Sequence, residues 1–396
     1  MGKFYAYLRR LGLTFSASIK EWACLNSCIM YIYQQKNWPN FTWDYSRLQN
    51  VLNDVSFARG VLLGRMNSIG FKLKSEATLN SLSQEIVKSS EIEGEILNTE
   101  QVRSSIARRL NLEFKSSAKE SHYIDGIVDM MLDATNGYMK PLTKKRLFAW
   151  HASLFPTGFS GMYKIDVGKF RLDKDGRMQV ISYRRNKEIV HFQAPEAFEI
   201  PKHISAFIKW FNKASNDVIS AAIAHLWFVT IHPFDDGNGR ITRALTEMML
   251  AKVDSSGSRF YSMSNQVLLR RKEYYDILEK TQSGSLDITD WILWFCQTLL
   301  NAVNDSLKHT DSIFQKAKFW QNNGDIDFSA NQQKITNRLF DGFDGNLTSS
   351  KWAKICKCSQ DTAIREISNL LKKNILKKVG EGRSTHYVLV LNNVND

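Results

Sequence analysis

A short stretch of the chain, HPFDDGNGRITR, carries its densest group of polar side chains. Gly237, Asn238 and Gly239 form a turn at the predicted start of a helix, where backbone N–H groups point into one concavity and bind anions. Arg240 and Arg243 are three residues apart, so they lie on the same helical face. Two guanidinium groups beside the positive end of a helix favour a polyphosphate over a single carboxylate.

Two further residues of the stretch suggest chemistry. Asp236 lies next to the expected anion site, where phosphate repels a carboxylate unless a divalent cation bridges them, and Mg²⁺ is the expected ion. His232 lies across the turn, in a position to accept a proton from an attacking hydroxyl. Each residue alone is better explained as structural, for example Asp235 and Asp236 as helix caps. The combination favours a nucleotide site, and the chain contains no Walker sequence.

The same stretch, starting at His232, resembles the signature of the Fic (filamentation induced by cAMP) family, His-x-Phe-x-Asp/Glu-Gly-Asn-Gly-Arg-x-x-Arg, at every specified position. The segments WHASLFP, GKFR and a predicted hairpin at 177–193 resemble the family's lead-in and flap. RRKEYYDILEK and LDITDWILWF resemble its downstream helices. The resemblance covers about residues 40–300.

What this resemblance implies is transfer of AMP from ATP to a Ser, Thr or Tyr hydroxyl of a target protein, or of the chain itself. His232 is then the general base, and Asp236 holds Mg²⁺ against the α- and β-phosphates. Position 270 departs from the family, since an arginine stands where many members have asparagine. The resemblance assigns Arg243 to the γ-phosphate. The other residues that it assigns to ATP binding are Gly237, Asn238, Gly239, Arg240 and Tyr274.

A second stretch, SSEIEGE, precedes this signature in the chain. On its own it predicts a solvated piece of amphipathic helix with Ile92 and Ile96 on one face. Ser89, Glu93 and Gly94 also fit the family's inhibitory pattern, Ser/Thr-x-x-x-Glu-Gly/Asn. The resemblance therefore implies a charge-assisted pair between Glu93 and Arg243, through one or both carboxylate oxygens, which keeps the resting enzyme mostly inactive.

The surrounding elements are predicted to be mainly helical. The chain has 396 residues, 43% of them apolar, and a formal charge of +13, which favours anionic partners. Five cysteines form neither an even framework nor a zinc set, so we expect a reduced, cytoplasmic protein. No apolar run approaches the roughly 20 residues of a membrane helix, and we expect no membrane contact.

The predicted hairpin at 177–193 either holds a target segment by strand pairing or is merely structural.

The resemblance implies a Fic-type helical bundle with a β-hairpin flap, and the pattern of the C-terminal residues predicts a winged helix after it. Residues 345–390 contain a helix-turn-helix pattern, a glycine-tipped hairpin, and nine basic against three acidic residues. The polar stretch 322–331 favours a boundary before this module. The predicted parts are an extension of uncertain status at 1–29, a helical domain with the inhibitory motif at 30–115, a Fic domain at 116–310 and a winged-helix-like domain at 325–396.

Other functions remain open at this stage. The main rival is a DNA-binding regulator, in which the winged helix binds DNA and the Fic core senses a nucleotide. The intact His232 and Asp236 argue against it, because a sensor needs no base. Within the enzyme class, the same site could remove AMP with Glu93 positioning water, or transfer another nucleotide. The resemblance is also compatible with a homodimer that blocks or releases the helix carrying Glu93.

Overall fold

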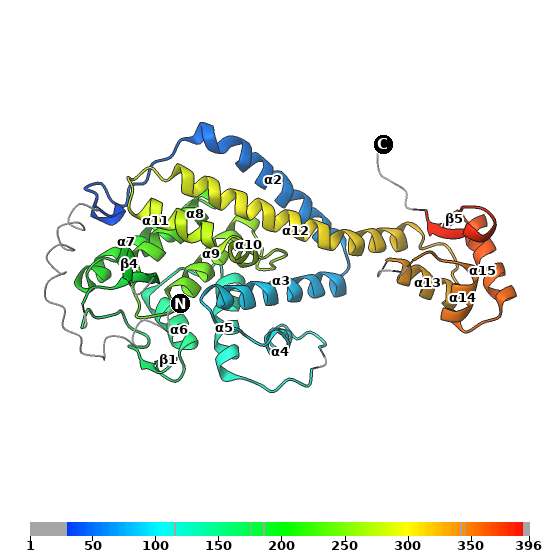
Figure 1. Ribbon diagram of the computed structural model, residues 1–396, viewed down its shortest axis with the longest axis horizontal. Helices are drawn as coiled ribbons and strands as arrows, with labels where there is room; N and C mark the ends of the chain where they lie inside the picture. Colours follow the sequence, from blue (N-terminus) through cyan, green and yellow to red (C-terminus); the bar gives the residue numbers. More distant parts are fainter. Residues whose placement is uncertain are drawn as a thin grey trace. The chain divides into compact units, whose positions relative to one another are not determined.

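The computed structural model describes residues 30–390, except residues 115, 175, 185–186, 341–342 and 344. The predicted extension at 1–29 lies outside the described residues. The described chain consists mainly of helices, with three small two-stranded antiparallel sheets (Figure 1), which confirms the predicted mainly-α class. Among the helices that the structure describes, none is both long and apolar enough to cross a bilayer.

The chain divides into two compact units. The first contains residues up to 64 together with 75–305, and the second contains 65–74 together with the residues from 306 onward. The division at residue 305 falls inside helix α12 (Thr289–Asn322) rather than in the polar stretch 322–331. The predicted domain ranges stay predictions.

Helices dominate the first unit. Those that lie wholly or largely within it are η3 (Ile32–Gln34), α2 (Tyr45–Ser68), α3 (Phe71–Ile92), α4 (Thr99–Arg109), α5 (His122–Asn136), α6 (Lys144–Leu154), η4 (Ala197–Glu199), α7 (Ile200–Phe211), α8 (Val218–Ile231), α9 (Asn238–Asp254), α10 (Met263–Leu269) and α11 (Arg271–Gln282).

The centre of this unit is the pair α8 and α9. Helix α8 is apolar around its whole circumference, and it is buried from Val218 to Ile231 almost without interruption, as such a helix must be. Helix α9 packs against α5, α6 and α8. Because α9 is buried along nearly its whole length, charged residues such as Arg240, Arg243 and Glu247 lie inside the protein and require partners there.

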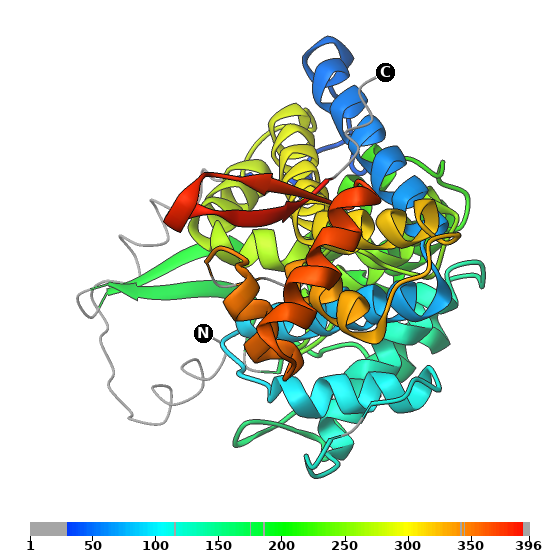
Figure 2. The same ribbon diagram turned by 90° about the vertical axis from the view of Figure 1, so that its right-hand side faces the viewer.

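The predicted flap is an antiparallel hairpin of β3 (Gln179–Arg184) and β4 (Lys187–Gln193), with a register shift between Val180 and Ile181. Figure 2 shows it in green, extending from the helical part of the unit. Its base is fixed by a small apolar cluster that includes Phe192. A shorter pair, β1 (Phe159–Ser160) and β2 (Tyr163–Lys164), follows α6.

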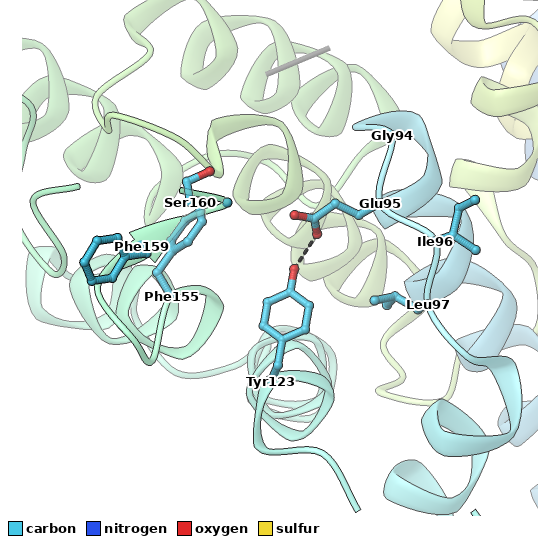
Figure 3. Close-up of a pocket in the computed structure, with 9 residues that line it drawn as sticks. Gly94, Glu95, Ile96, Leu97, Tyr123, Phe155, Phe159 and Ser160 are labelled. Carbon is cyan, nitrogen blue, oxygen red and sulfur yellow. Dashed lines mark hydrogen bonds between the residues drawn. The ribbon is translucent and has the colours of Figure 1, made fainter. Parts of the chain in front are cut away.

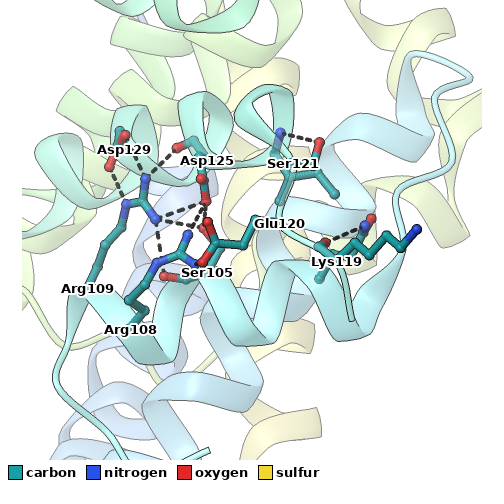
Figure 4. Close-up of polar contacts among 10 residues, drawn as sticks. Ser105, Arg108, Arg109, Lys119, Glu120, Ser121, Asp125 and Asp129 are labelled. Carbon is teal, nitrogen blue, oxygen red and sulfur yellow. Dashed lines mark hydrogen bonds and ion pairs between the residues drawn. The ribbon is translucent and has the colours of Figure 1, made fainter. Parts of the chain in front are cut away.

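An ion-pair network joins α4 to α5 (Figure 4). The guanidinium of Arg109 lies 3.0 Å from an Asp125 oxygen and 2.9 Å from an Asp129 oxygen, and Arg108 donates to the same Asp125 oxygen at 2.8 Å. Ser105 also donates to Asp125, at 2.5 Å. Although single exposed ion pairs contribute little, a shared carboxylate with several donors fixes the relative position of the two helices.

The second unit has its own apolar core, in which Trp352 and Ile335 are fully buried. Besides the end of α12, its elements are α13 (Ala330–Phe340), α14 (Ser349–Cys356), α15 (Gln360–Lys372), β5 (Leu376–Val379), η5 (Gly382–Ser384) and β6 (His386–Leu389). The turn between α14 and α15 passes through Lys357 in the left-handed region, with φ 52°, and Ser359 caps α15. The identification of this unit as a winged helix stays a prediction.

Candidate active site

The site begins where α8 ends. His232 is the C-cap of α8, with φ 50° and ψ 59°, and its N–H donates to the Phe228 carbonyl at 3.1 Å. A non-glycine residue in this left-handed region costs about 1–3 kcal/mol and persists only where the surroundings impose it. The sharp change of direction turns the following loop back over the start of α9.

Two buried side chains hold the loop between α8 and α9. Phe234 is fully buried, and its ring stacks on that of His151 with the centroids 4.3 Å apart. Asn238 accepts from the Phe234 N–H at 3.0 Å and donates to the Phe234 carbonyl at 2.8 Å. The amide side chain of Asn238 is therefore occupied within the loop, so this residue can meet a phosphate only through its backbone N–H.

The start of α9 requires glycine. Gly237 has φ 81°, and a Cβ atom added there would lie 2.9 Å from the Phe155 ring. Asn238 is the first residue of α9, so the N–H groups of the next residues belong to its first turn and have no acceptor within the helix. Free N–H groups of this kind are what an anion site at a helix start requires, and phosphate binding there stays a prediction.

His232 is held as a neutral base. Its Nδ1 lies 3.2 Å from the Val229 carbonyl oxygen, and because a carbonyl only accepts, Nδ1 carries the proton. Nε2 is then the atom with a free lone pair. Burial, and next the positive charge of Arg171, lower the pKa of His232 to about 4. At neutral pH the imidazole is uncharged and able to take a proton.

Arg171, to which the sequence assigned no role, fixes the His232 turn. It is 2% exposed, and its Nε donates to the His232 carbonyl oxygen at 2.8 Å. Its backbone N–H donates to the Pro233 carbonyl at 3.0 Å, and its Nη2 donates to the Pro195 carbonyl at 2.5 Å. Pro195 follows β4 closely, so one guanidinium connects the base of the hairpin to the turn that carries His232.

Arg243 is brought together with both residues of the predicted inhibitory motif. Its Nη2 lies 2.8 Å from Glu93 Oε1 and 2.9 Å from the Ser89 carbonyl oxygen, and its Nε donates to Ser89 Oγ at 2.7 Å. The side chain of Arg243 is 4% exposed. Glu93 engages it through one oxygen, and the hydroxyl and carbonyl oxygens of Ser89 also accept from it, so the arginine has three acceptors and the Glu93 contact is not bidentate.

The Glu93 carboxylate also lies directly against the start of α9. A Cβ atom added at Gly239 would be 2.0 Å from Glu93 Oε1 and 3.1 Å from Arg243 Nη1. A carboxylate at this position occupies the concavity expected to bind an anion. Helix α3 ends at Ile92, so Glu93 lies in the turn that follows, and Gly94 in that turn has φ 82°.

Arg240 and Asp236 lie on the other side of the helix start. Arg240 is 2% exposed, and its Nη1 lies 2.9 Å from Glu95 Oε2 and 3.0 Å from the Tyr123 hydroxyl. Asp236 is partly exposed and lies 3.9 Å from Arg240 Nη2. The Ser160 hydroxyl donates to its carboxylate. Asp236 therefore presents carboxylate oxygen to the site and is held in place by a neighbouring hydroxyl.

Tyr274 lies beside Arg243 but is 2% exposed, with its hydroxyl 2.9 Å from His225 Nε2. The next residue, Tyr275, is 36% exposed. Arg270 donates to Thr298 at 2.5 Å and lies over the ring of Trp294. Its side chain is thus engaged with α12. The predicted nucleotide contact of Tyr274 stays a prediction, and it involves a residue with a small exposed surface.

The structure thus brings Ser89 and Glu93 to Arg243 and places Asp236 near Arg240, at the beginning of α9, whereas Tyr274 is buried against His225. Sequence reasoning gave no role to His151, Arg171, Ser160, Glu95 and Tyr123. His151 is fully buried and accepts from the Gly168 N–H, while its Nε2 lies 3.2 Å from the Asp236 carbonyl oxygen. The segments WHASLFP and GKFR, which contain His151 and Arg171, were the available signals.

Comparison with protein families identifies two regions. Residues 141–250 match the Fic/DOC family, and residues 31–112 match a domain of unknown function, DUF4172. The fold resembles that of a Fic family protein from Desulfovibrio desulfuricans, with a TM-score of 0.53 and 19% identity over 89% of this chain and 98% of that one.

Two curated relatives match the central part of the chain. A probable protein adenylyltransferase of Aquifex aeolicus is 26% identical over 113 residues, which are 27% of this chain and 33% of the relative. The protein adenylyltransferase Fic of Nematostella vectensis is 30% identical over 112 residues, 26% of this chain and 24% of the relative. The match therefore spans a third or less of either relative's length.

Proposed function

Because residues 141–250 form a Fic/DOC-family domain, we propose that this chain is a protein adenylyltransferase. It transfers AMP from ATP to a Ser, Thr or Tyr hydroxyl of a target protein and releases pyrophosphate. The observation that carries the proposal is the position of a neutral His232, with its lone pair on Nε2, beside a helix start lined by Arg240 and Arg243. The names of the two relatives agree with this activity.

Each residue of the site has its own role in the proposed reaction. The hydroxyl oxygen attacks the α-phosphorus, the bond from that phosphorus to the bridging oxygen of the β-phosphate breaks, and the hydroxyl proton passes to His232 Nε2. The N–H groups at the start of α9, together with Arg240 and Arg243, hold phosphate oxygens and stabilise the charge that develops on them. Arg171 keeps the imidazole in register by fixing the backbone of its turn.

Asp236 fits the role of a magnesium ligand. Its carboxylate and the Ser160 hydroxyl are oxygen donors of the kind that Mg²⁺ prefers. Among the described residues, no group of three or more His, Cys, Asp or Glu side chains is arranged to hold a metal alone. We therefore expect the ion to bind together with ATP, whose phosphate oxygens complete its coordination and whose charge it neutralises.

The activity is proposed to be held in check by Glu93. Its carboxylate takes a donor of Arg243 and lies over Gly239, where a phosphate group would otherwise bind. ATP then binds weakly or with its phosphates displaced, and a displacement of about 1 Å can reduce the rate roughly 100-fold. The β3–β4 hairpin, tied to the His232 turn through Arg171, is the element proposed to hold the target segment.

Mass spectrometry of the full chain after incubation with ATP and Mg²⁺ tests the proposal. We expect an AMP adduct on the protein itself in the wild type, more of it in Glu93→Gly, and none in His232→Ala. UTP in parallel reactions reports nucleotide choice, and a pre-modified protein tests AMP removal. The proposal is wrong if neither the wild type nor Glu93→Gly forms an adduct or labels proteins of a cell extract.

A further inference from the structure

The chain turns sharply immediately after the inhibitory helix. Helix α3 ends at Ile92, and Gly94 adopts φ 82°. The Gly94 N–H donates to the Glu91 carbonyl at 2.9 Å, and the Glu95 N–H donates to the Ser90 carbonyl at 3.0 Å, as in a glycine helix C-cap. Residues 93–95, which we term the inhibitory turn, therefore carry two carboxylates, one on each side of the glycine.

Each carboxylate of the inhibitory turn contacts a different arginine of α9. Glu93 contacts Arg243, whereas Glu95 Oε2 lies 2.9 Å from Arg240 Nη1 and accepts from the Tyr123 hydroxyl (Figure 3). Arg240 Nη1 also lies 3.0 Å from the Tyr123 oxygen. The three groups close a triangle of polar contacts. The side chain of Glu95 is 23% exposed and that of Arg240 is 2% exposed, so solvent screens this pair little.

Packing contributes little to holding the inhibitory turn. A cavity of about 300 Å³ borders residues 94–97 and extends to Tyr123, Phe155 and Ser160 (Figure 3). Beyond the turn, Ile96 is 92% exposed, and Leu97 is the next buried side chain. Because one side of the turn faces a cavity and another faces solvent, the polar contacts of Glu95 add to the backbone hydrogen bonds of the turn and to the Glu93–Arg243 contact in keeping it in place.

The two partners of Glu95, Tyr123 and Arg240, are themselves held in place by neighbouring helices. Tyr123 lies in the first turn of α5, the helix that the ion pairs of Asp125 and Asp129 connect to α4 (Figure 4). Arg240 lies in α9 and faces the Phe155 ring, with its guanidinium carbon 5.0 Å from the ring centroid. Glu95 thus joins the inhibitory turn after α3 to two well-packed helices.

We infer that Glu95, together with Tyr123, is a positioning residue of the inhibitory state: it holds the inhibitory turn so that Glu93 stays over Gly239. The inference rests on the proposed function and deepens its regulation. The effect that the inference predicts for a Glu95 variant depends on Glu93. Loss of the Glu95 contacts raises activity only while Glu93 is present, because Glu95 acts through Glu93.

Two other roles for Glu95 predict different results. If Glu95 orients Arg240 for phosphate binding, its loss lowers the rate with or without Glu93. If Glu95 competes with phosphate for Arg240, its loss raises the rate even when Glu93 is absent. A double-mutant cycle therefore separates the three roles.

The cycle compares the full-length wild type, Glu95→Ala, Glu93→Gly and the double variant by their initial rates of AMP incorporation. We expect Glu95→Ala to raise the rate about tenfold, since hydrogen bonds to charged groups are individually strong. We expect the double variant to match Glu93→Gly within about twofold, the usual limit of additivity errors. Tyr123→Phe, which keeps the ring, should raise the rate by a smaller factor.

Hydrogen exchange supplies a readout that does not depend on activity. The amides of residues 93–97 should exchange faster in Glu95→Ala than in the wild type, and Glu91→Ala, a change on the exposed side of the same helix end, should leave them unaltered. The inference is overturned if exchange at the turn is unchanged, or if the double variant differs from Glu93→Gly in either direction. An inactive Glu93→Gly would instead refute the proposed function, whatever the exchange shows.

Discussion

Replacing Glu93 by glutamine removes one negative charge from the contact with Arg243 and leaves the shape of the side chain intact. In the structure this contact is 2.8 Å long, with the arginine side chain 4% exposed and the glutamate side chain 33% exposed. A hydrogen bond to a charged group contributes about 1.5–3 kcal/mol, and each 1.4 kcal/mol is a factor of ten. Glutamine keeps part of that bond, so the lower end of the range applies.

We therefore expect Glu93→Gln to raise the rate of AMP incorporation at subsaturating ATP about tenfold, and Glu93→Gly to raise it up to about 100-fold. The assay is the initial rate of incorporation from labelled ATP, measured together with the affinity for ATP. Both quantities should change, because the carboxylate lies at Gly239, where we propose that a phosphate group binds.

Glu91→Gln is the matched control. It removes the same charge two residues away, from a surface pair with Lys88 at 2.8 Å that has no contact with Arg243. We expect a rate within about twofold of the wild type, since such exposed pairs contribute little. Equal activation by Glu91→Gln and Glu93→Gln would show that net charge, and not the Arg243 contact, controls the enzyme. An unchanged rate in Glu93→Gln would refute the inhibitory role itself.

The remaining predictions concern the base and the groups that position it. The rate of AMP transfer should fall only as the pH drops through about 4, the lowered pKa of His232, and not near about 6.5, the ordinary pKa of histidine, because a base acts only when unprotonated. A pH profile with circular dichroism as the folding control measures this. Arg171→Lys loses the forked contacts to the His232 and Pro195 carbonyls. The free energy of unfolding should therefore fall by about 2–4 kcal/mol, seen as a lower Tm, and kcat should fall more than the affinity for ATP. Ser89→Ala removes one acceptor of Arg243 and should raise the rate about fivefold, less than Glu93→Gly, in the same incorporation assay.

The local parts of the site could be predicted from the sequence because their geometry depends on short spacings. The start of α9 at the Gly237-Asn238-Gly239 turn, where Gly237 has a positive φ, follows from residues within a few positions of one another. The Glu93–Arg243 contact joins residues 150 positions apart, and only the family resemblance gave it in advance. Spacing alone predicts which groups are available, whereas a family pattern also predicts which of them meet.

The contacts that the sequence could not reveal are those between distant elements without such a pattern. Arg171 bonds the His232 carbonyl from 61 positions away, and Glu95 reaches Arg240 from 145 positions away. One local expectation was wrong as well. Ile92 is fully buried but Ile96 is 92% exposed, because α3 ends at Ile92 and the turn that follows changes the direction of the chain. The helical spacing rule fails where a glycine ends the helix.

In the proposed inhibited state, we expect release of Arg243 to take a local change at the end of α3 and not a movement of the whole helix. Two turns before Glu93, the buried Glu85 accepts from the Ser264 N–H at 2.9 Å and from the Ser262 hydroxyl at 2.8 Å. From this fixed point α3 continues for about 10 Å, or seven residues, to Ile92, and Glu93 follows directly. Because Ser89 lies in this last part of α3 and Glu93 follows it, unwinding the helix end should free the arginine from all three acceptors at once. The glycine turn makes the end of the helix the place where that unwinding costs least.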